Sequence, residues 1–129
     1  MTDGNAPYHA HIYFSLEQRP AAVALRNALK ALRSAGGPIL FVGRMTKGRA
    51  GPHPIPQYEV HFLGRSLAQI TAMLAASGLR VLVHPLTNDD LADHTSLGTW
   101  IGDPVALDLS VLDPFGQNQG IPRFGKSDF

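Results

Sequence analysis

Residues 8–14, with the sequence YHAHIYF, alternate strictly between two kinds of side chain. One parity is apolar and consists of Ala10, Ile12 and Phe14. The other parity carries rings with polar atoms and consists of His9, His11 and Tyr13. A period of two is typical of a β-strand with one face buried in a core. The segment therefore predicts a strand whose apolar face must be covered by another layer of the protein.

The remaining sequence predicts further strands and helices in a regular order. Ser15 and Gln18 have the spacing of a capping box, and apolar residues then recur at helical spacing until the glycines at 36–37. Ser66 and Gln69 repeat that signal before a second helix, which ends at Gly78. The other predicted elements are strands over 39–45, 58–63, 80–84 and 105–112, a loop over 46–57 and a short helix within 87–96.

The order β-α-β-β-α-β over residues 8–84 predicts an α+β, ferredoxin-like sandwich with helices on one face of the sheet. The strand at 105–112 and the following tail would be additions to that core. A chain of 129 residues, 44% of them hydrophobic, is of the size that forms a single domain. We expect one domain over 1–129, with 1–7 and 114–129 as extended tails. By analogy with the fold, we expect the first and third strands to be parallel neighbours and the fourth to run antiparallel beside the first.

Six histidines stand out in a chain that has no cysteine. Without thiolates, a metal could be held only by imidazole and carboxylate ligands. Strand parity places the strand histidines on the face opposite the core, which no predicted helix covers. There His9, His11, His53 and His84 would converge, with Glu59 as a carboxylate of suitable parity. We expect His61 to lie at the far end of the third strand, away from the group.

Several functional classes have no support in this sequence. The formal net charge is only +1 and the basic residues are scattered, so nucleic acid is not an expected partner. No window approaches the ~18 consecutive apolar residues of a membrane span, and no signal peptide is recognised, so we expect a soluble, cytoplasmic protein. Nucleotide-binding glycine loops and the G-x-S-x-G motif of serine hydrolases are absent.

Four ordered segments resemble the DOPA 4,5-dioxygenase family. They are YHAHIYF at 8–14, GPHPIPQYEVHF at 51–62, VLVHPLTNDDLADHT at 81–95 and WIGDPVALDLSVL at 100–112. The resemblance implies a ferredoxin-like α+β protein, commonly dimeric. It also implies an extradiol dioxygenase that opens the ring of a catechol such as L-DOPA with non-haem Fe(II) and O₂.

The resemblance implies roles for particular residues. His11, His53 and His84 would be the metal ligands, with Glu59 as an alternative carboxylate ligand. His9 and His94 would be acid/base groups, because the ordinary pKa of histidine suits both the acceptance and the return of a proton. Tyr13 would orient the substrate, and Arg80 or Arg44 would bind a carboxylate.

Two other functions fit the same residues. An imidazole cluster suits zinc as well as iron, so one alternative is a metal-binding protein without dioxygenase activity. The other is a dimeric interaction module that packs its uncovered sheet face against a partner. A homodimer is the expectation in any case, since that face requires a cover.

Overall fold

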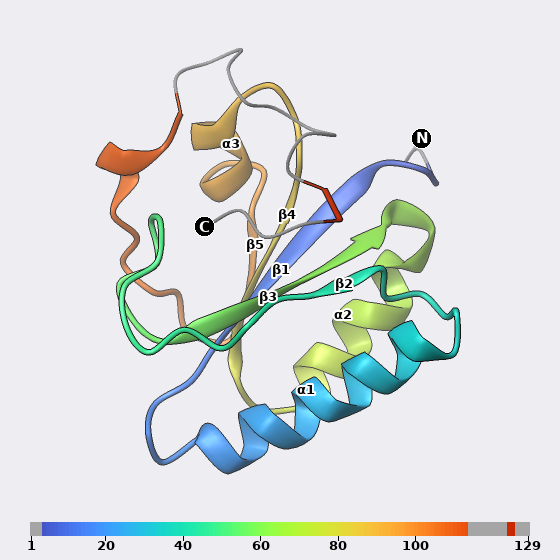
Figure 1. Ribbon diagram of the computed structural model, residues 1–129. Coiled ribbons are helices and arrows are strands. Elements are labelled where there is room, and N and C mark those ends of the chain that lie inside the picture. Colours follow the sequence, from blue (N-terminus) through green and yellow to red (C-terminus); the bar gives the residue numbers. More distant parts are fainter. Residues whose placement is uncertain (1–3, 114–123, 126–129) are drawn as a thin grey trace.

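The computed structural model describes residues 4–113 and 124–125, which form a five-stranded antiparallel sheet with helices on both faces (Figure 1). The strands, in the spatial order β2-β3-β1-β4-β5, have these bounds: β1 Pro7–Tyr13, β2 Phe41–Val42, β3 Gln57–Leu63, β4 Arg80–Pro85 and β5 Thr99–Ile101. The α-helices are α1 Arg19–Ser34, α2 Leu67–Ala76 and α3 Asp90–His94. The predicted α+β class and the βαββαβ order are confirmed.

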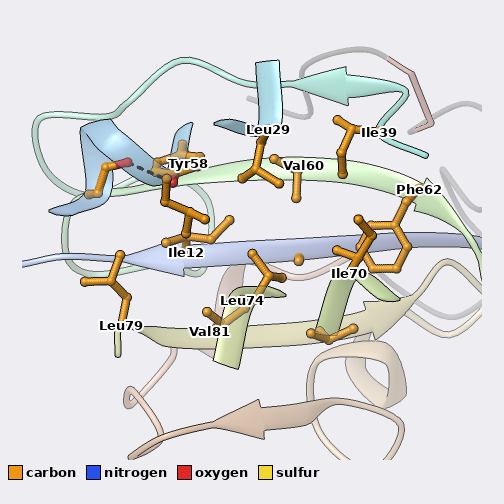
Figure 2. Close-up of a cluster of buried hydrophobic side chains, with 14 of the residues drawn as sticks. Ile12, Leu29, Ile39, Tyr58, Val60, Phe62, Ile70, Leu74, Leu79 and Val81 are labelled. Atoms are coloured by element: carbon orange, nitrogen blue, oxygen red, sulfur yellow. Dashed lines mark hydrogen bonds between the residues drawn. The ribbon is translucent and has the colours of Figure 1, made fainter. Parts of the chain in front are cut away.

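The two long helices lie on one side of the sheet, as Figure 1 shows, and their apolar residues are buried against it. Leu25 and Leu29 of α1 and Ile70 and Leu74 of α2 pack against the apolar face of the strands. Figure 2 labels the last three of these residues. The Tyr58 hydroxyl donates to the Ala22 carbonyl at 3.0 Å, so this core also satisfies its buried phenol. The predicted core parity is therefore confirmed.

Both long helices end as the sequence predicts, and α2 begins directly after its predicted cap residue Ser66, whereas α1 begins after Gln18 rather than after Ser15. Gly36 and Gly78 adopt φ angles of 72° and 77°, a left-handed conformation in which glycine has no steric penalty. Ser15 and Gln18 do exchange reciprocal hydrogen bonds, but they do so in the turn that precedes α1. Ser66 precedes α2, but its side chain makes no capping hydrogen bond, because a 3₁₀ turn over Gly64–Ser66 leads into that helix.

The predicted parallel pairing of the first and third strands is wrong. β1 and β3 are antiparallel, with His9 opposite His61 and His11 opposite Glu59. The reason is topological: β2 and β3 form an antiparallel pair, so a helical crossover that makes β2 parallel to β1 turns β3 the other way. The start of β1 consequently lies beside the end of β3.

The added fifth strand exists, but it lies earlier in the sequence than predicted. The predicted strand over 105–112 is wrong: that stretch is irregular and contains a 3₁₀ turn, Leu109–Val111. β5 is formed instead by Thr99–Ile101, which pairs with β4. The second strand is also short, Phe41–Val42, although Leu40, Gly43 and Thr46 each donate a backbone hydrogen bond to β3.

The second face of the sheet is covered by the chain itself, so the expectation of an uncovered face is wrong. The loop at 46–56, α3 and the segment 102–113 lie over it (Figure 1). Asp108 N donates to the Pro52 carbonyl at 2.8 Å, and Asp113 N donates to Asp90 at 2.8 Å, which fasten these covering segments together. The argument for a dimer that rested on this face no longer holds.

Among the described residues, no helix is both long and apolar enough to cross a bilayer. The predicted tails fall largely outside the described residues. Of the first tail, Pro7 already belongs to β1, and the Ala6 carbonyl accepts the Gly64 amide at 2.8 Å.

Candidate metal centre

All six histidines are buried and gather on the second face of the sheet. β1, β3 and β4 carry four of them, because the period of a strand keeps alternate residues on one face. The loop before β3 and the last turn of α3 contribute the other two. The positions are His9 and His11 on β1, His53 in the loop, His61 on β3, His84 on β4 and His94 on α3.

His11 and His84 meet at the centre of the cluster. Their Nε2 atoms lie 3.0 Å apart. His11 Nδ1 faces the side-chain carbonyl oxygen Oε1 of Gln57 at 3.1 Å, and His84 Nδ1 faces the backbone carbonyl of Pro85 at 2.7 Å. A carbonyl oxygen accepts only, so in each neutral ring Nδ1 carries the proton and Nε2 carries a lone pair. The two lone pairs therefore point at each other across 3.0 Å with no proton between them.

His94 and His53 border this pair. The His94 ring lies 4.3 Å from the His84 ring, and the His53 ring lies 4.0 Å from the His11 ring, measured between centroids. His94 Nδ1 donates to the Asp90 carbonyl at 2.8 Å, so its Nε2 also carries a lone pair. The Tyr13 hydroxyl fixes His53 through a 2.6 Å hydrogen bond to Nδ1.

A carboxylate links the two remaining histidines. Glu59 Oε2 lies 3.4 Å from His9 Nδ1 and 3.3 Å from His61 Nε2. The Gly125 amide donates to His61 Nδ1 at 2.9 Å, so the proton of a neutral His61 ring is on Nε2 and faces Glu59. If the proton of a neutral His9 ring is on Nδ1, facing Glu59, then His9 Nε2 keeps its lone pair.

Burial makes the central imidazoles weak bases. It lowers the pKa of His11 and His84 well below the usual 6.5, and neighbouring imidazoles lower both further. Burial and the nearby His94 lower the pKa of His53 to about 3. At neutral pH these rings are therefore uncharged, which is the form in which imidazole binds a metal.

The donor set fits a transition-metal ion. Two groups of imidazoles bring their nitrogen atoms within 4.8 Å of one another: His9, His11 and His84, and His11, His53 and His94. His9, Glu59 and His61 form a third group of this kind. A cation would remove the conflict between the facing lone pairs of His11 and His84. The hydrogen bonds from Nδ1 to carbonyl oxygens are those that typically orient metal-bound histidines.

The structure brings most of the predicted site residues together. His9, His11, His53, His84 and His94 all belong to the cluster. Tyr13 is fully buried and contacts His53 through its hydroxyl. Arg80 lies at the opposite end of β4 from His84, paired with Tyr13 across the sheet.

The expectation that His61 lies far from the cluster is wrong. Its ring stacks on His9 with centroids 3.6 Å apart, because the two residues are direct partners in the antiparallel pair. Strand parity combined with the hairpin order of β2 and β3 was the signal that could have found it. Sequence reasoning also missed Gln57, the partner of His11, for which the sequence holds no comparable signal.

The sequence of this chain is similar to those of several known proteins. The model of the Dopa 4,5-dioxygenase family matches residues 8–111. A protein of Amanita muscaria named DOPA 4,5-dioxygenase is 34% identical over 111 residues, covering 81% of this chain and 49% of its own length. An uncharacterised 21.2 kDa protein of Botryotinia fuckeliana is 28% identical over 122 residues, covering 87% of this chain and 66% of its own. The chain thus spans about half of the first relative and two thirds of the second.

A solved structure shares the fold. The crystal structure of a candidate dioxygenase from Nostoc punctiforme superimposes with a TM-score of 0.73 at 32% sequence identity. The match covers 84% of this chain and 91% of the other.

Proposed function

Since the chain belongs to the Dopa 4,5-dioxygenase family, we propose that it is a non-haem Fe(II) extradiol dioxygenase that opens the ring of a catechol with O₂. The observation that carries the proposal is the 3.0 Å approach of the His11 and His84 Nε2 lone pairs, with both Nδ1 atoms turned to carbonyl oxygens.

In this proposal His11 and His84, which belong to one of the two imidazole groups, hold the metal together with His53, which shares the other group with His11. His11 and His84 contribute Nε2, and His53 joins them from the loop, where prolines on both sides restrict the backbone. When bound, Fe(II) supplies the redox chemistry and a template for the diol and O₂. Zinc would fit the same imidazoles, so the ion found in purified protein need not be the active one.

His94 and His9 are the proposed acid/base groups. The bond from His94 Nδ1 to the Asp90 carbonyl leaves Nε2 free to accept a proton from a catechol hydroxyl and to return it as the ring opens. His9 has a carboxylate at its Nδ1, and a carboxylate in this position stabilises the imidazolium that forms when a histidine accepts a proton. Glu59 therefore supports His9 as a positioning group.

The proposed function is tested by anaerobic reconstitution with Fe(II) or Zn(II), followed by catechols in air while oxygen uptake and the visible spectrum are recorded. We expect Fe(II) to give oxygen uptake and a yellow ring-opened product, and Zn(II) to give neither. His11→Ala and His84→Ala should abolish both signals. Binding of iron without oxygen uptake by any catechol would favour a metal-binding protein without this activity.

A further inference from the structure

A small pocket lies beside His94, at the edge of the histidine cluster. Its volume is about 210 Å³, and its lining residues are His94, Thr95, Trp100, Val105, Leu107 and Leu109. His94 is 6% exposed, whereas the other five histidines are at most 1% exposed. Of the cluster histidines, His94 is the one that lines this pocket, so the pocket gives a small molecule its contact with the cluster.

Most of the lining is apolar, with Trp100, Val105, Leu107 and Leu109 beside His94 and Thr95. Trp100 contributes an indole ring to the lining, and the Tyr13 ring stacks on that indole with centroids 5.7 Å apart, which holds its orientation. Trp100 is also fixed by its pairing with Leu82 across β4 and β5. Pockets for drug-sized ligands measure roughly 300–1,000 Å³, so a space of this size fits one ring with a short substituent. Aromatic rings prefer offset or edge contacts with an indole of this kind.

Among the residues that the structure describes, the lining of the pocket includes no group that would neutralise a charged substituent. None of its six lining residues is Lys, Arg, Asp or Glu. Asp108 lies between the lining residues Leu107 and Leu109 in sequence, and its Oδ2 is 2.6 Å from Arg49 Nη1, so this carboxylate already has a guanidinium partner. Placing a charged group against apolar walls without a partner is unfavourable.

We propose that this pocket, the Trp100 pocket, binds the ring of an aromatic diol whose substituent is short and uncharged. The chain would then act on simple or alkyl-substituted catechols in preference to the zwitterionic amino acid L-DOPA. This inference rests on the proposed function, because it is His94 that joins the pocket to the candidate metal centre.

Trp100 makes binding directly measurable, because it is the only tryptophan in the sequence. Protein loaded with Fe(II) without oxygen is titrated with 4-ethylcatechol, 3-(3,4-dihydroxyphenyl)propionate and L-DOPA while indole fluorescence is recorded. Free tryptophan amide corrects for light absorbed by the ligands. We expect saturable quenching and a Kd for 4-ethylcatechol at least ~10-fold lower than for either charged ligand. Equal or tighter binding of L-DOPA would overturn the proposal.

A charge introduced into the pocket provides a second test. Leu109 is 43% exposed, so Leu109→Arg and its control Leu109→Met should both fold. The arginine should improve binding of the propionate relative to 4-ethylcatechol by ~5-fold or more, whereas methionine should leave that ratio unchanged. An unchanged ratio in the arginine variant would place the binding site elsewhere.

Oxygen uptake separates this inference from the proposed function. Quenching by 4-ethylcatechol without oxygen uptake would leave the pocket assignment standing and remove the dioxygenase activity. Oxygen uptake that is faster with L-DOPA than with 4-ethylcatechol would leave the activity standing and overturn the pocket assignment.

Discussion

The rings of His9 and His61 stack face to face, with centroids 3.6 Å apart and planes inclined by 8°. Glu59 lies beside both, within 3.4 Å of His9 Nδ1 and 3.3 Å of His61 Nε2. The Gly125 amide requires the proton of a neutral His61 to be on Nε2, which leaves that nitrogen no lone pair for a metal. The three residues are therefore better described as a network that orients His9 than as a separate metal site.

Glu59→Gln and His61→Gln should reduce turnover while the protein keeps its metal. Both changes disturb the support of His9 and leave His11 and His84 intact, and loss of such an orienting group typically costs ~10–100-fold. Metal analysis and oxygen uptake of the two variants check this, with His11→Ala as the variant that loses metal. If Glu59→Gln lost its metal as fully as His11→Ala, Glu59 would be a ligand.

Gln57→Leu should weaken metal binding, and Gln57→Glu should retain it. The Gln57 carbonyl accepts the proton of His11 Nδ1, and a carboxylate can accept it equally well, whereas leucine leaves the buried N–H without a partner. We expect ~10-fold or greater loss of Zn(II) affinity for the leucine variant, measured by competition with a chelator. Similar affinities in the two variants would show that this hydrogen bond does not orient His11.

The metal-free protein should lose stability as the pH falls below about 6.5. His11, His53 and His84 have pKa values lowered in the folded state, so the unfolded chain binds more protons in this range. The free energy of unfolding that these histidines contribute is fully present above pH 6.5. It decreases towards pH 3 by about 1.4 kcal/mol per pH unit for each histidine. Urea unfolding from pH 7 to pH 4 measures the slope. His53→Gln should make it shallower, and an unchanged slope would show that His53 is not held neutral.

Gly98→Ala should destabilise the protein and displace His94. A Cβ atom at residue 98 would lie 2.9 Å from Leu82 Cδ1, 3.1 Å from the Asp93 carbonyl oxygen and 3.5 Å from the His94 carbonyl carbon. The end of α3 must therefore move, at a cost of about 1–3 kcal/mol.

Gly48→Ala is the matched control, because nothing lies within 4 Å of its Cβ position. Thermal unfolding and Trp100 quenching by 4-ethylcatechol compare the two variants. Equal behaviour of both would show that the end of α3 tolerates the methyl group.

The sequence by itself determined the elements and the face on which each strand residue lies. Alternation within a strand has a fixed period, so His9, His11, Glu59 and His84 had to share one face once the strands were recognised. The order of strands and helices similarly predicted the α+β class, and the ordered motifs identified the family.

Tertiary structure decided which of these residues meet. The antiparallel register that stacks His61 on His9 depends on how β2 and β3 pair, and the pattern within either strand alone does not give that direction. Tertiary contacts also decided where the fifth strand lies. Thr99–Ile101 pairs with β4, whereas the alternating apolar residues within 105–112 pack over the second face of the sheet without forming a strand.

The covering of that face was likewise decided only by long-range contacts. The local sequence of residues 46–56 and 102–113 does not indicate that these segments form a covering layer. The Asp108 amide binds the Pro52 carbonyl and the Asp113 amide binds Asp90, which closes the two segments over the histidines. Local sequence fixes which way a side chain points, because that depends on the backbone period. Contacts between distant segments decide whether it reaches water, a metal or another histidine.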